Sequence, residues 1–479
     1  MIRQLGNVLP AALLLCSVAA LAQESPPNIL LLIGDDVGVE QFAPFGIGSS
    51  PASTPNLDAL AARGMRFSRV WSQAMCSPTR ASIIAGRYGF RTGVGSGARG
   101  EGIDGPYPDA PAVPSAALTE IDEDLSRDVM PYLARYVADR NLPTVADGLP
   151  PDEPTLPAQL KTAPIAYSTS VFGKWHLGSL KNGWLEHPAR TGFDHVSVLM
   201  KNEPESYFAW WENVNGELEE RNGYTPTRKI DDALEWIGSQ DDQPWFLWLA
   251  FNLAHFPQHI PEVEHLDTAG VDPADSRAAL DVMIARLDQN IGRLLAGMDA
   301  ETRENTIVIF VGDNGTTGVS IDPPFHRERA KFTIYEGGLR VPLIIAGPGI
   351  PENRASDALV NTTDIYATIL DLAGAERPRS HTLDSVSLLP YFDNPDRPSL
   401  RDWVYADAFE TGQGIANGLY TVRDDRYKLV RARASTELYD VEADIGETNN
   451  LLADGISHAE RATVDRLQNI ADALHSDAR

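Results

Sequence analysis

Several short stretches of the chain are apolar at almost every position. They are Asn28–Gly34, Trp245–Phe251, Thr306–Gly312 and Leu343–Ala346, and such runs are typical of parallel strands that are buried on both faces of a sheet. Asp275–Met298 instead repeats its apolar residues with helical spacing, which predicts a long amphipathic helix with one stripe in the core. Strands that alternate with helices predict an α/β fold, in which helices cover both faces of a mostly parallel sheet.

The pattern changes beyond about residue 390. Tyr420–Arg423 and Arg426–Val430 flank an acidic turn and predict antiparallel strands, and Glu437–Asp440 is a further candidate. An amphipathic helix from Ala459 to His475 closes the chain. This part of the chain therefore predicts a small α+β unit with an antiparallel sheet.

The chain divides into segments of different composition. Residues 1–22 combine a basic start, a short apolar core and a small-residue cleavage site, the pattern of a secretory signal peptide. We expect the main domain over residues 23–390 and the C-terminal subdomain over residues 391–479. Residues 97–154 are rich in proline, glycine and acids, with one helical patch at Asp122–Ala138. We interpret them as a surface insertion that serves substrate choice, or as a solvated decoration without a role.

The signal peptide predicts an exported protein, either periplasmic or secreted. No later stretch is long and apolar enough to span a membrane. Removal of the signal peptide also removes Cys16, so Cys76 becomes the single thiol and no intrachain disulfide can form. The net charge of −27 argues against nucleic acid and anionic membranes as partners. An anionic substrate therefore requires a local cationic pocket.

Two of the apolar strands end in oxygen-bearing side chains. Asp35 and Asp36 follow the first strand, and Asp313 and Asn314 follow the strand at 306–312. Ligands of open α/β sheets bind beyond the carboxyl ends of strands, and adjacent acids at such a place repel each other unless a cation lies between them. Four hard oxygen donors suit Ca²⁺ or Mg²⁺ rather than zinc. The alternative is that both are ordinary polar loops.

One cysteine and several basic side chains follow other predicted elements. Cys76 comes just before a predicted helix, where a thiol is either activated by the helix N-terminus or simply packed in the core. Lys174 and His176 follow a predicted strand and, two residues apart on an extended segment, face the same side. His255 follows the apolar strand at 245–251.

In their order along the chain, these motifs resemble those of the type I sulfatases. Cys76-Ser77-Pro78-Thr79-Arg80 matches the C-x-P-x-R signature of that family. The other matching motifs are Asp35-Asp36, Gly173-Lys174-Trp175-His176-Leu177-Gly178, His255, Asp313-Asn314-Gly315, and Lys331 in Lys-x₄-Glu-Gly-Gly-x-Arg-Val-Pro. The resemblance extends from Asn28 to about Leu451, and it departs from the family at the insertion and at Ile445, where a proline is more usual.

The resemblance implies an alkaline-phosphatase-like α/β fold and a nucleophile made by modification. In the family the signature cysteine is oxidised to formylglycine (3-oxoalanine) by a maturing enzyme, and Cys76 stands at that position here. One hydroxyl of the hydrated aldehyde attacks sulfur and the alcohol leaves. The other hydroxyl is then deprotonated, which expels sulfate and regenerates the aldehyde.

The resemblance also implies how the cation is bound. Ca²⁺, or Mg²⁺, lowers the pKa of the nucleophile. Its ligands by resemblance are Asp35, Asp36, Asp313, Asn314 and the converted Cys76. Arg80 is expected to hold the diol and one of the metal-bound carboxylates.

Four further residues receive roles from the same resemblance. Lys174, His255 and Lys331 are expected to bind the sulfate oxygens. His255 or Lys331 is the expected acid for the leaving group, and His176 the expected base that collapses the intermediate.

The sequence therefore predicts a sulfatase that hydrolyses an aryl or carbohydrate sulfate ester. A phosphonate or phosphate ester hydrolase with the same formylglycine stays an alternative, because such a pocket also suits a phosphoryl group. The other alternative is a secreted binding protein in which Cys76 is never converted. A zinc phosphatase is disfavoured, because it needs more His and Asp ligands. Trp210 and Trp211 either line a substrate pocket or lie in the core.

Overall fold

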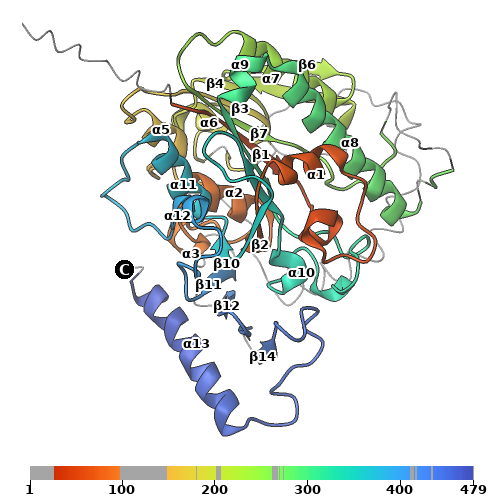
Figure 1. The fold of residues 1–479 in the computed structure, drawn as a ribbon, viewed down its shortest axis with the longest axis vertical. Helices are drawn as coiled ribbons and strands as arrows, with labels where there is room; N and C mark the ends of the chain where they lie inside the picture. The colour runs from red at the N-terminus through yellow and green to blue at the C-terminus, as the bar shows by residue number, and fades with distance from the viewer. Residues whose placement is uncertain are drawn as a thin grey trace, which may run out of the picture.

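The computed structural model describes residues 26–97, 148–179, 181–200, 207–261, 268, 270–272, 274–409, 415, 418–432 and 435–477. The expected signal peptide and the helical patch expected at Asp122–Ala138 lie outside these residues, so both stay predictions. A ten-stranded sheet with helices on both faces forms the larger part, and a four-stranded sheet forms the smaller part (Figure 1).

The large sheet is built around β1 (Asn28–Gly34). Its strand order is β10-β2-β9-β8-β1-β7-β3-β4-β5-β6. The other strands are β2 (Gly64–Trp71), β3 (Ser168–Lys174), β4 (His195–Leu199), β5 (Ala209–Val214), β6 (Glu217–Asn222), β7 (Trp245–Ala250), β8 (Thr306–Gly312), β9 (Leu343–Ala346) and β10 (Arg354–Asn361). The strands from β8 to β4 in this order are parallel, whereas β9 and β5 run against their neighbours. The prediction of a mostly parallel sheet is confirmed.

Alternate residues of β1 belong to two cores on opposite faces of the sheet, because successive side chains of a strand point to opposite sides. Ile29, Leu31 and Ile33 share one core with residues of α2 (Cys76–Ala85), α5 (Leu156–Leu160), α11 (Asp364–Ala373) and α12 (Leu389–Asp393). Leu30 and Leu32 share the other with residues of α1 (Pro55–Ala62), α7 (Thr225–Gly238) and α8 (Ser276–Gly297). Further short helices are α3 (Gly89–Thr92), α6 (His187–Arg190), α9 (Ala300–Glu304) and α10 (Glu336–Leu339).

Two helices bear directly on the sequence predictions. The expected apolar stripe of α8 is buried throughout, and Asp275 caps the helix by accepting from the backbone N–H groups of Arg277 and Ala278. Cys76 is the first residue of α2, and Met75 is its N-cap. The cysteine thus lies one position further into the helix than the sequence suggested.

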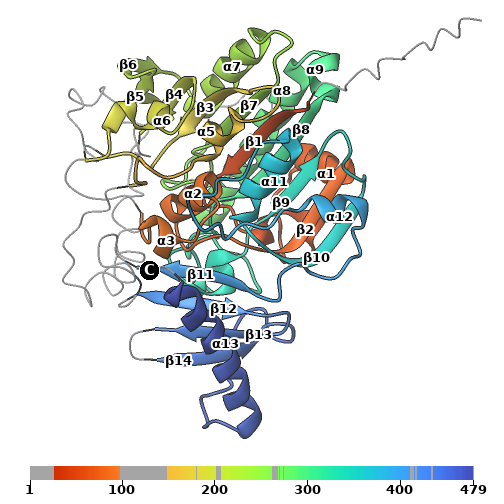
Figure 2. The same ribbon diagram turned by 90° about the vertical axis from the view of Figure 1, so that its left-hand side faces the viewer.

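The small sheet packs between α13 and the main sheet, as Figure 2 shows. Its antiparallel strands are β11 (Val404–Ala408), β12 (Leu419–Arg423), β13 (Tyr427–Arg431) and β14 (Thr436–Asp440), followed by α13 (His458–Ser476). Tyr405 faces Leu467 of α13, whereas its neighbours Val404 and Ala406 belong to a core with Trp71 of β2. The predicted antiparallel sheet and closing helix are confirmed. The expected domain boundary at residue 390 falls within α12 and stays a prediction.

None of the helices that the structure describes is both long enough and apolar enough to cross a bilayer.

Candidate active site

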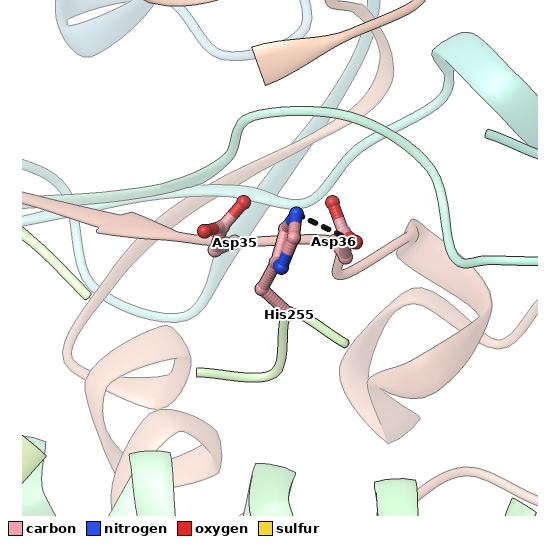
Figure 3. Close-up of side chains that lie close together, drawn as sticks. All are labelled: Asp35, Asp36 and His255. Carbon is pink, nitrogen blue, oxygen red and sulfur yellow. Dashed lines mark ion pairs between the residues drawn. The ribbon is translucent and has the colours of Figure 1, made fainter. Parts of the chain in front are cut away.

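The carboxyl ends of four adjacent parallel strands bring the site together. Gly34 of β1 pairs with Gly312 of β8, so Asp35 and Asp313 follow at the same level of the sheet. On the other side of β1, β7 leads into the loop of His255. Figure 3 shows the imidazole of this histidine between the carboxylates of Asp35 and Asp36, and the ligand atoms of the three residues lie within 4.8 Å of one another.

Arg80 joins α2 to the ends of two strands. Its Nε and Nη2 donate to Oδ2 of Asp313 at 3.1 and 2.8 Å. Its Nη1 donates to the backbone carbonyl of Lys174 at 2.7 Å. The other carboxylate oxygen of Asp313 accepts from the backbone N–H of Asp36 at 3.1 Å. This one guanidinium therefore fixes the helix of Cys76 against β8 and β3.

Two buried lysines neutralise the adjacent acids that follow β1. Nζ of Lys174 lies 2.7 Å from Oδ2 of Asp35. Lys331 donates to Oδ1 of Asp36, which also accepts from Nδ2 of Asn314 at 2.9 Å. Each of these acids therefore uses one oxygen for a cationic partner.

The remaining oxygens of this group are left over. Oδ1 of Asp35, Oδ2 of Asp36 and Oδ1 of Asn314 are buried and have no hydrogen-bond partner among the described residues. A buried oxygen that accepts no hydrogen bond costs free energy. Three such oxygens at the carboxyl ends of β1 and β8 form a set of ligands that fits Ca²⁺ or Mg²⁺. The sulfur of Cys76 lies within 4.8 Å of carboxylate oxygens of Asp35 and Asp313. The residues present thus fit both the cation and an oxygen-bearing side chain at position 76.

The pKa values of the two adjacent acids are shifted in opposite directions. Burial raises the pKa of Asp35 well above its usual value, and the carboxylates of Asp313 and Asp36 add to this shift. Burial acts on Asp36 as well, but the charge of Lys331 outweighs it and lowers the pKa of that carboxyl. Burial and two neighbouring carboxylates therefore disfavour the ionised form of Asp35, and the positive charge of a bound cation would favour it.

His176 lies beside Cys76. Its Nδ1 is 3.3 Å from the cysteine sulfur, and its backbone carbonyl accepts from the hydroxyl of Ser77 at 2.8 Å. His176 has a φ of +59°, so the extended segment expected through this residue ends before it. The side chains of Lys174 and His176 both reach the site, although not by facing one side of a continuous strand.

The tautomer of His255 follows from its contacts. Nδ1 lies 2.7 Å from the backbone carbonyl of Phe256, which can only accept, so Nδ1 carries a proton. Nε2 faces the site, 4.0 Å from Oδ2 of Asp36. Burial lowers the pKa of His255 well below its usual value, and the charges of Lys174 and Lys331 lower it further.

The structure brings together every site residue that the sequence singled out. These are Asp35, Asp36, Cys76, Arg80, Lys174, His176, His255, Asp313, Asn314 and Lys331. Their catalytic and metal-binding roles stay predictions. Trp210 belongs to the core instead, since it is 3% exposed and its Nε1 donates to Glu212. The hydrogen bond of Ser77 was missed, because no local pattern announces a contact with a residue 99 positions away.

Comparison with known proteins gives the class of this protein. A profile described as "Sulfatase" matches residues 27–375, and one described as "N-sulphoglucosamine sulphohydrolase, C-terminal" matches residues 326–472. The chain belongs to the sulfatase family of sulfuric ester hydrolases.

Three similar proteins are informative. N-acetylgalactosamine-6-sulfatase of Canis lupus familiaris is 30% identical over 407 residues, which cover 78% of this chain and 67% of that protein. The crystal structure of Ps i-CgsB in complex with k-i-k-neocarrahexaose has a TM-score of 0.73 at 22% identity, covering 95% of this chain and 94% of that one. The structure of BT4656 in complex with its substrate D-glucosamine-2-N,6-O-disulfate has a TM-score of 0.67 at 20% identity, covering 95% and 98%. The two structures share the alkaline-phosphatase-like fold of this chain.

Proposed function

We propose that the protein hydrolyses a saccharide sulfate ester, with residue 76 acting as formylglycine. The reaction converts R–O–SO₃⁻ and water to R–OH, SO₄²⁻ and a proton. The observation that carries this proposal is the set of unpartnered oxygens of Asp35, Asp36 and Asn314. Asp35 also lies beside the sulfur of Cys76, and Lys174 and Lys331 pair with the two acids. The printed name of N-acetylgalactosamine-6-sulfatase and the saccharide ligands named for the two structures support a saccharide ester as the substrate.

Two groups that the family uses fit these residues. A divalent cation, Ca²⁺ or Mg²⁺, when bound by Asp35, Asp36, Asp313, Asn314 and residue 76, lowers the pKa of a nucleophilic hydroxyl. Hydrated formylglycine at position 76 supplies that hydroxyl.

The other side chains bind the anionic ester. Lys174 and Lys331 are buried ammonium groups. Burial opposes their charge, but the carboxylate of Asp35 raises the pKa of Lys174 above its usual value, and the carboxylate of Asp36 does the same for Lys331. Both therefore stay charged and attract sulfate oxygens. Together with a bound divalent cation, these charges would give the site the net positive charge that a protein with a net charge of −27 needs for such a substrate.

The two histidines move protons. An approaching sulfate group favours the imidazolium of His255, because an anion raises the pKa that burial had lowered. His255 Nε2 or Lys331 Nζ then gives a proton to the leaving oxygen. His176, whose Nδ1 faces residue 76, takes a proton from that side chain. Arg80 holds Asp313 and residue 76 in position throughout.

Conversion of Cys76 is tested by mass spectrometry of the peptide that contains it. Protein from the native host, which also supplies a maturing enzyme, is expected to show a peptide lighter by about 18 Da than the unmodified one, the difference between a thiol and an aldehyde. Finding only unmodified cysteine there contradicts the proposal and supports a binding protein. Cys76→Ala is the matched inactive control, since it keeps the helix and removes the precursor of the aldehyde.

Substrate class is tested by turnover of matched sulfate and phosphate esters of one sugar. The sulfate ester is expected to have the higher kcat/KM. A clear preference for the phosphate ester means that the protein is a phosphoester hydrolase. Export, which the expected signal peptide supports, is tested by fractionating the native host with an antibody against the protein.

A further inference from the structure

A tyrosine that belongs to none of the matching motifs reaches the loop of His255. Tyr207 precedes β5, and its side chain is 1% exposed. Its hydroxyl donates to the backbone carbonyl of Asn252 and lies 2.8 Å from the backbone carbonyl of His255. We propose that Tyr207 is a positioning residue that fixes the imidazole of His255 against the scissile ester. This inference rests on the proposed function.

The two carbonyls belong to one turn. The backbone N–H of His255 donates to the carbonyl of Asn252 at 3.0 Å, which closes the turn. A carbonyl oxygen only accepts, so the phenol is the donor to both, and its single proton is shared between them. The side chain of His255 extends from the end of this turn, and its Nδ1 is held by the next carbonyl along, that of Phe256. The main chain from 252 to 256 therefore decides where Nε2 lies.

Tyr207 is itself held firmly. Its ring packs on the ring of His259, with centroids 4.2 Å apart, and stacks on Tyr224 at 6.2 Å. It belongs to the same core as Leu247 and Leu249 of β7. In the sheet, β4 and β3 separate β5 from β7. The buried hydroxyl of Tyr207 thus connects the start of β5 to the loop that follows the central strand β7.

The hydrogen bonds of Tyr207 matter because the position of Nε2 of His255 has to be kept within a narrow range. This atom lies 4.0 Å from Oδ2 of Asp36, which is one of the oxygens without a hydrogen-bond partner, and the ligand atoms of His255, Asp35 and Asp36 lie within 4.8 Å of one another. A displacement of about 1 Å is enough to lower a rate about 100-fold. Tyr207→Phe keeps the ring and its packing. It removes the phenolic donor from the carbonyl of His255 and one of the two donors from the carbonyl of Asn252, so the turn is expected to shift.

Leaving-group dependence separates positioning from a general loss of structure. A sugar oxygen needs a proton as it leaves, whereas para-nitrophenolate leaves without one. Misplacing a proton donor therefore affects the sugar ester more. Tyr207→Phe is expected to lower kcat about 10- to 100-fold on a sugar sulfate and clearly less on para-nitrophenyl sulfate, with a smaller change in KM.

A double-mutant cycle with His255→Ala tests the route of the effect. If Tyr207 acts through His255, adding Tyr207→Phe to the His255→Ala enzyme changes kcat by less than about 2-fold, because residues that act as a unit are not additive. Tyr224→Phe is the matched control. It removes a hydroxyl from the same aromatic cluster, one that bonds Nε2 of His259 at 3.0 Å, and kcat is expected to stay unchanged.

All variants are measured with Cys76 conversion quantified by mass spectrometry and with folding checked by circular dichroism. The inference is overturned if Tyr207→Phe leaves kcat unchanged, or if it lowers kcat equally with and without His255. Absence of any sulfate ester turnover by the converted wild-type enzyme overturns the proposed function, and this inference with it. Turnover that is indifferent to Tyr207→Phe overturns the inference alone.

Discussion

Arg80 donates twice to a single oxygen of Asp313, Oδ2, at distances of 3.1 and 2.8 Å. The second oxygen of the same carboxylate accepts from the backbone N–H of Asp36. Asp313 is thus oriented from both ends and connects α2, β8 and the segment after β1. In the proposed cation site this carboxylate would be a pre-oriented ligand, because its orientation is set by Arg80 and Asp36.

Asp313→Asn is expected to abolish stabilisation by Ca²⁺. The amide has one charge fewer, and its NH₂ group conflicts with the donors of Arg80 if it replaces Oδ2. At a Ca²⁺ concentration 100 times its Kd the wild-type protein gains about 2.7 kcal/mol of unfolding free energy relative to protein in chelator. Thermal melts of both proteins with Ca²⁺ and with chelator measure the difference.

The control for this experiment is another buried aspartate. Asp288 of α8 accepts from the backbone N–H groups of Asn56 and Leu57 at the start of α1. Asp288→Asn is expected to lower the melting temperature in chelator but to keep the upward shift on adding Ca²⁺. Loss of the Ca²⁺ shift in both variants, or in neither, contradicts the assignment of Asp313 as a ligand.

His176→Ala is expected to slow the release of sulfate from residue 76 more than the release of the alcohol that precedes it. In the proposed reaction the alcohol leaves before His176 takes its proton, so the first equivalent of alcohol is still released quickly. Stopped-flow measurements with a chromogenic aryl sulfate should then show a fast phase of about one equivalent per converted site, followed by slow turnover. If the fast phase and the steady turnover are both lost, His176 acts in substrate binding instead.

Much of the central sheet was predictable because its strands are buried on both faces. β8 and β9 have the bounds that the apolar runs predicted, and β7 differs by one residue at its end. β6 (Glu217–Asn222) was not predicted, because at the sheet edge most of its residues are exposed and its sequence is polar. Three of the first four residues of β10 are exposed for the same reason.

The site was predictable to the level of which residues meet, but not of how they are held. Asp35 and Asp313 were found because each follows an apolar strand. The contacts of Tyr207 with the loop of His255 join residues 45 and 48 positions apart. No periodicity or spacing reports such a contact, because it depends on the packing of the outer strands.

Lys428 is expected to be essential for stability although it lies far from the site in sequence. Its Nζ lies 2.9 Å from Glu447 and 3.4 Å from Glu336, and all three side chains are buried. The contact joins β13 to α10. Lys428→Met removes the cationic partner of the buried Glu447, whereas Glu336 keeps Arg423 at 3.1 Å. Breaking a buried pair in this way costs about 3–5 kcal/mol of unfolding free energy.

Urea denaturation followed by circular dichroism measures this loss. Arg426→Met is the matched control, because Arg426 lies two residues away on the same hairpin and pairs with Asp440 in an exposed position. Little change in unfolding free energy is expected for Arg426→Met, since exposed ion pairs contribute little to stability. If both variants unfold at the same urea concentration as the wild-type protein, the buried cluster is not a source of stability.

Asp407 of β11 is expected to make stability depend on pH. Burial raises the pKa of its carboxyl to about 7, and the charge of Asp384 adds to the shift, although Oδ2 accepts from the backbone N–H of Phe90 at 2.9 Å. Between about pH 4 and pH 7 the folded protein holds a proton that the unfolded chain has lost. The contribution of Asp407 to stability is therefore fully present below about pH 4, falls as the pH rises through this window, and is lost above the folded pKa.

Asp407→Asn keeps a carbonyl oxygen for Phe90 but cannot ionise, so its unfolding free energy should decline less between pH 5 and pH 8. Urea denaturation of both proteins at the two pH values, at one Ca²⁺ concentration, gives the difference, which at about 1.4 kcal/mol per pKa unit amounts to a few kcal/mol. Equal declines in the two proteins would mean that Asp407 stays ionised in the core, held by donors other than Phe90.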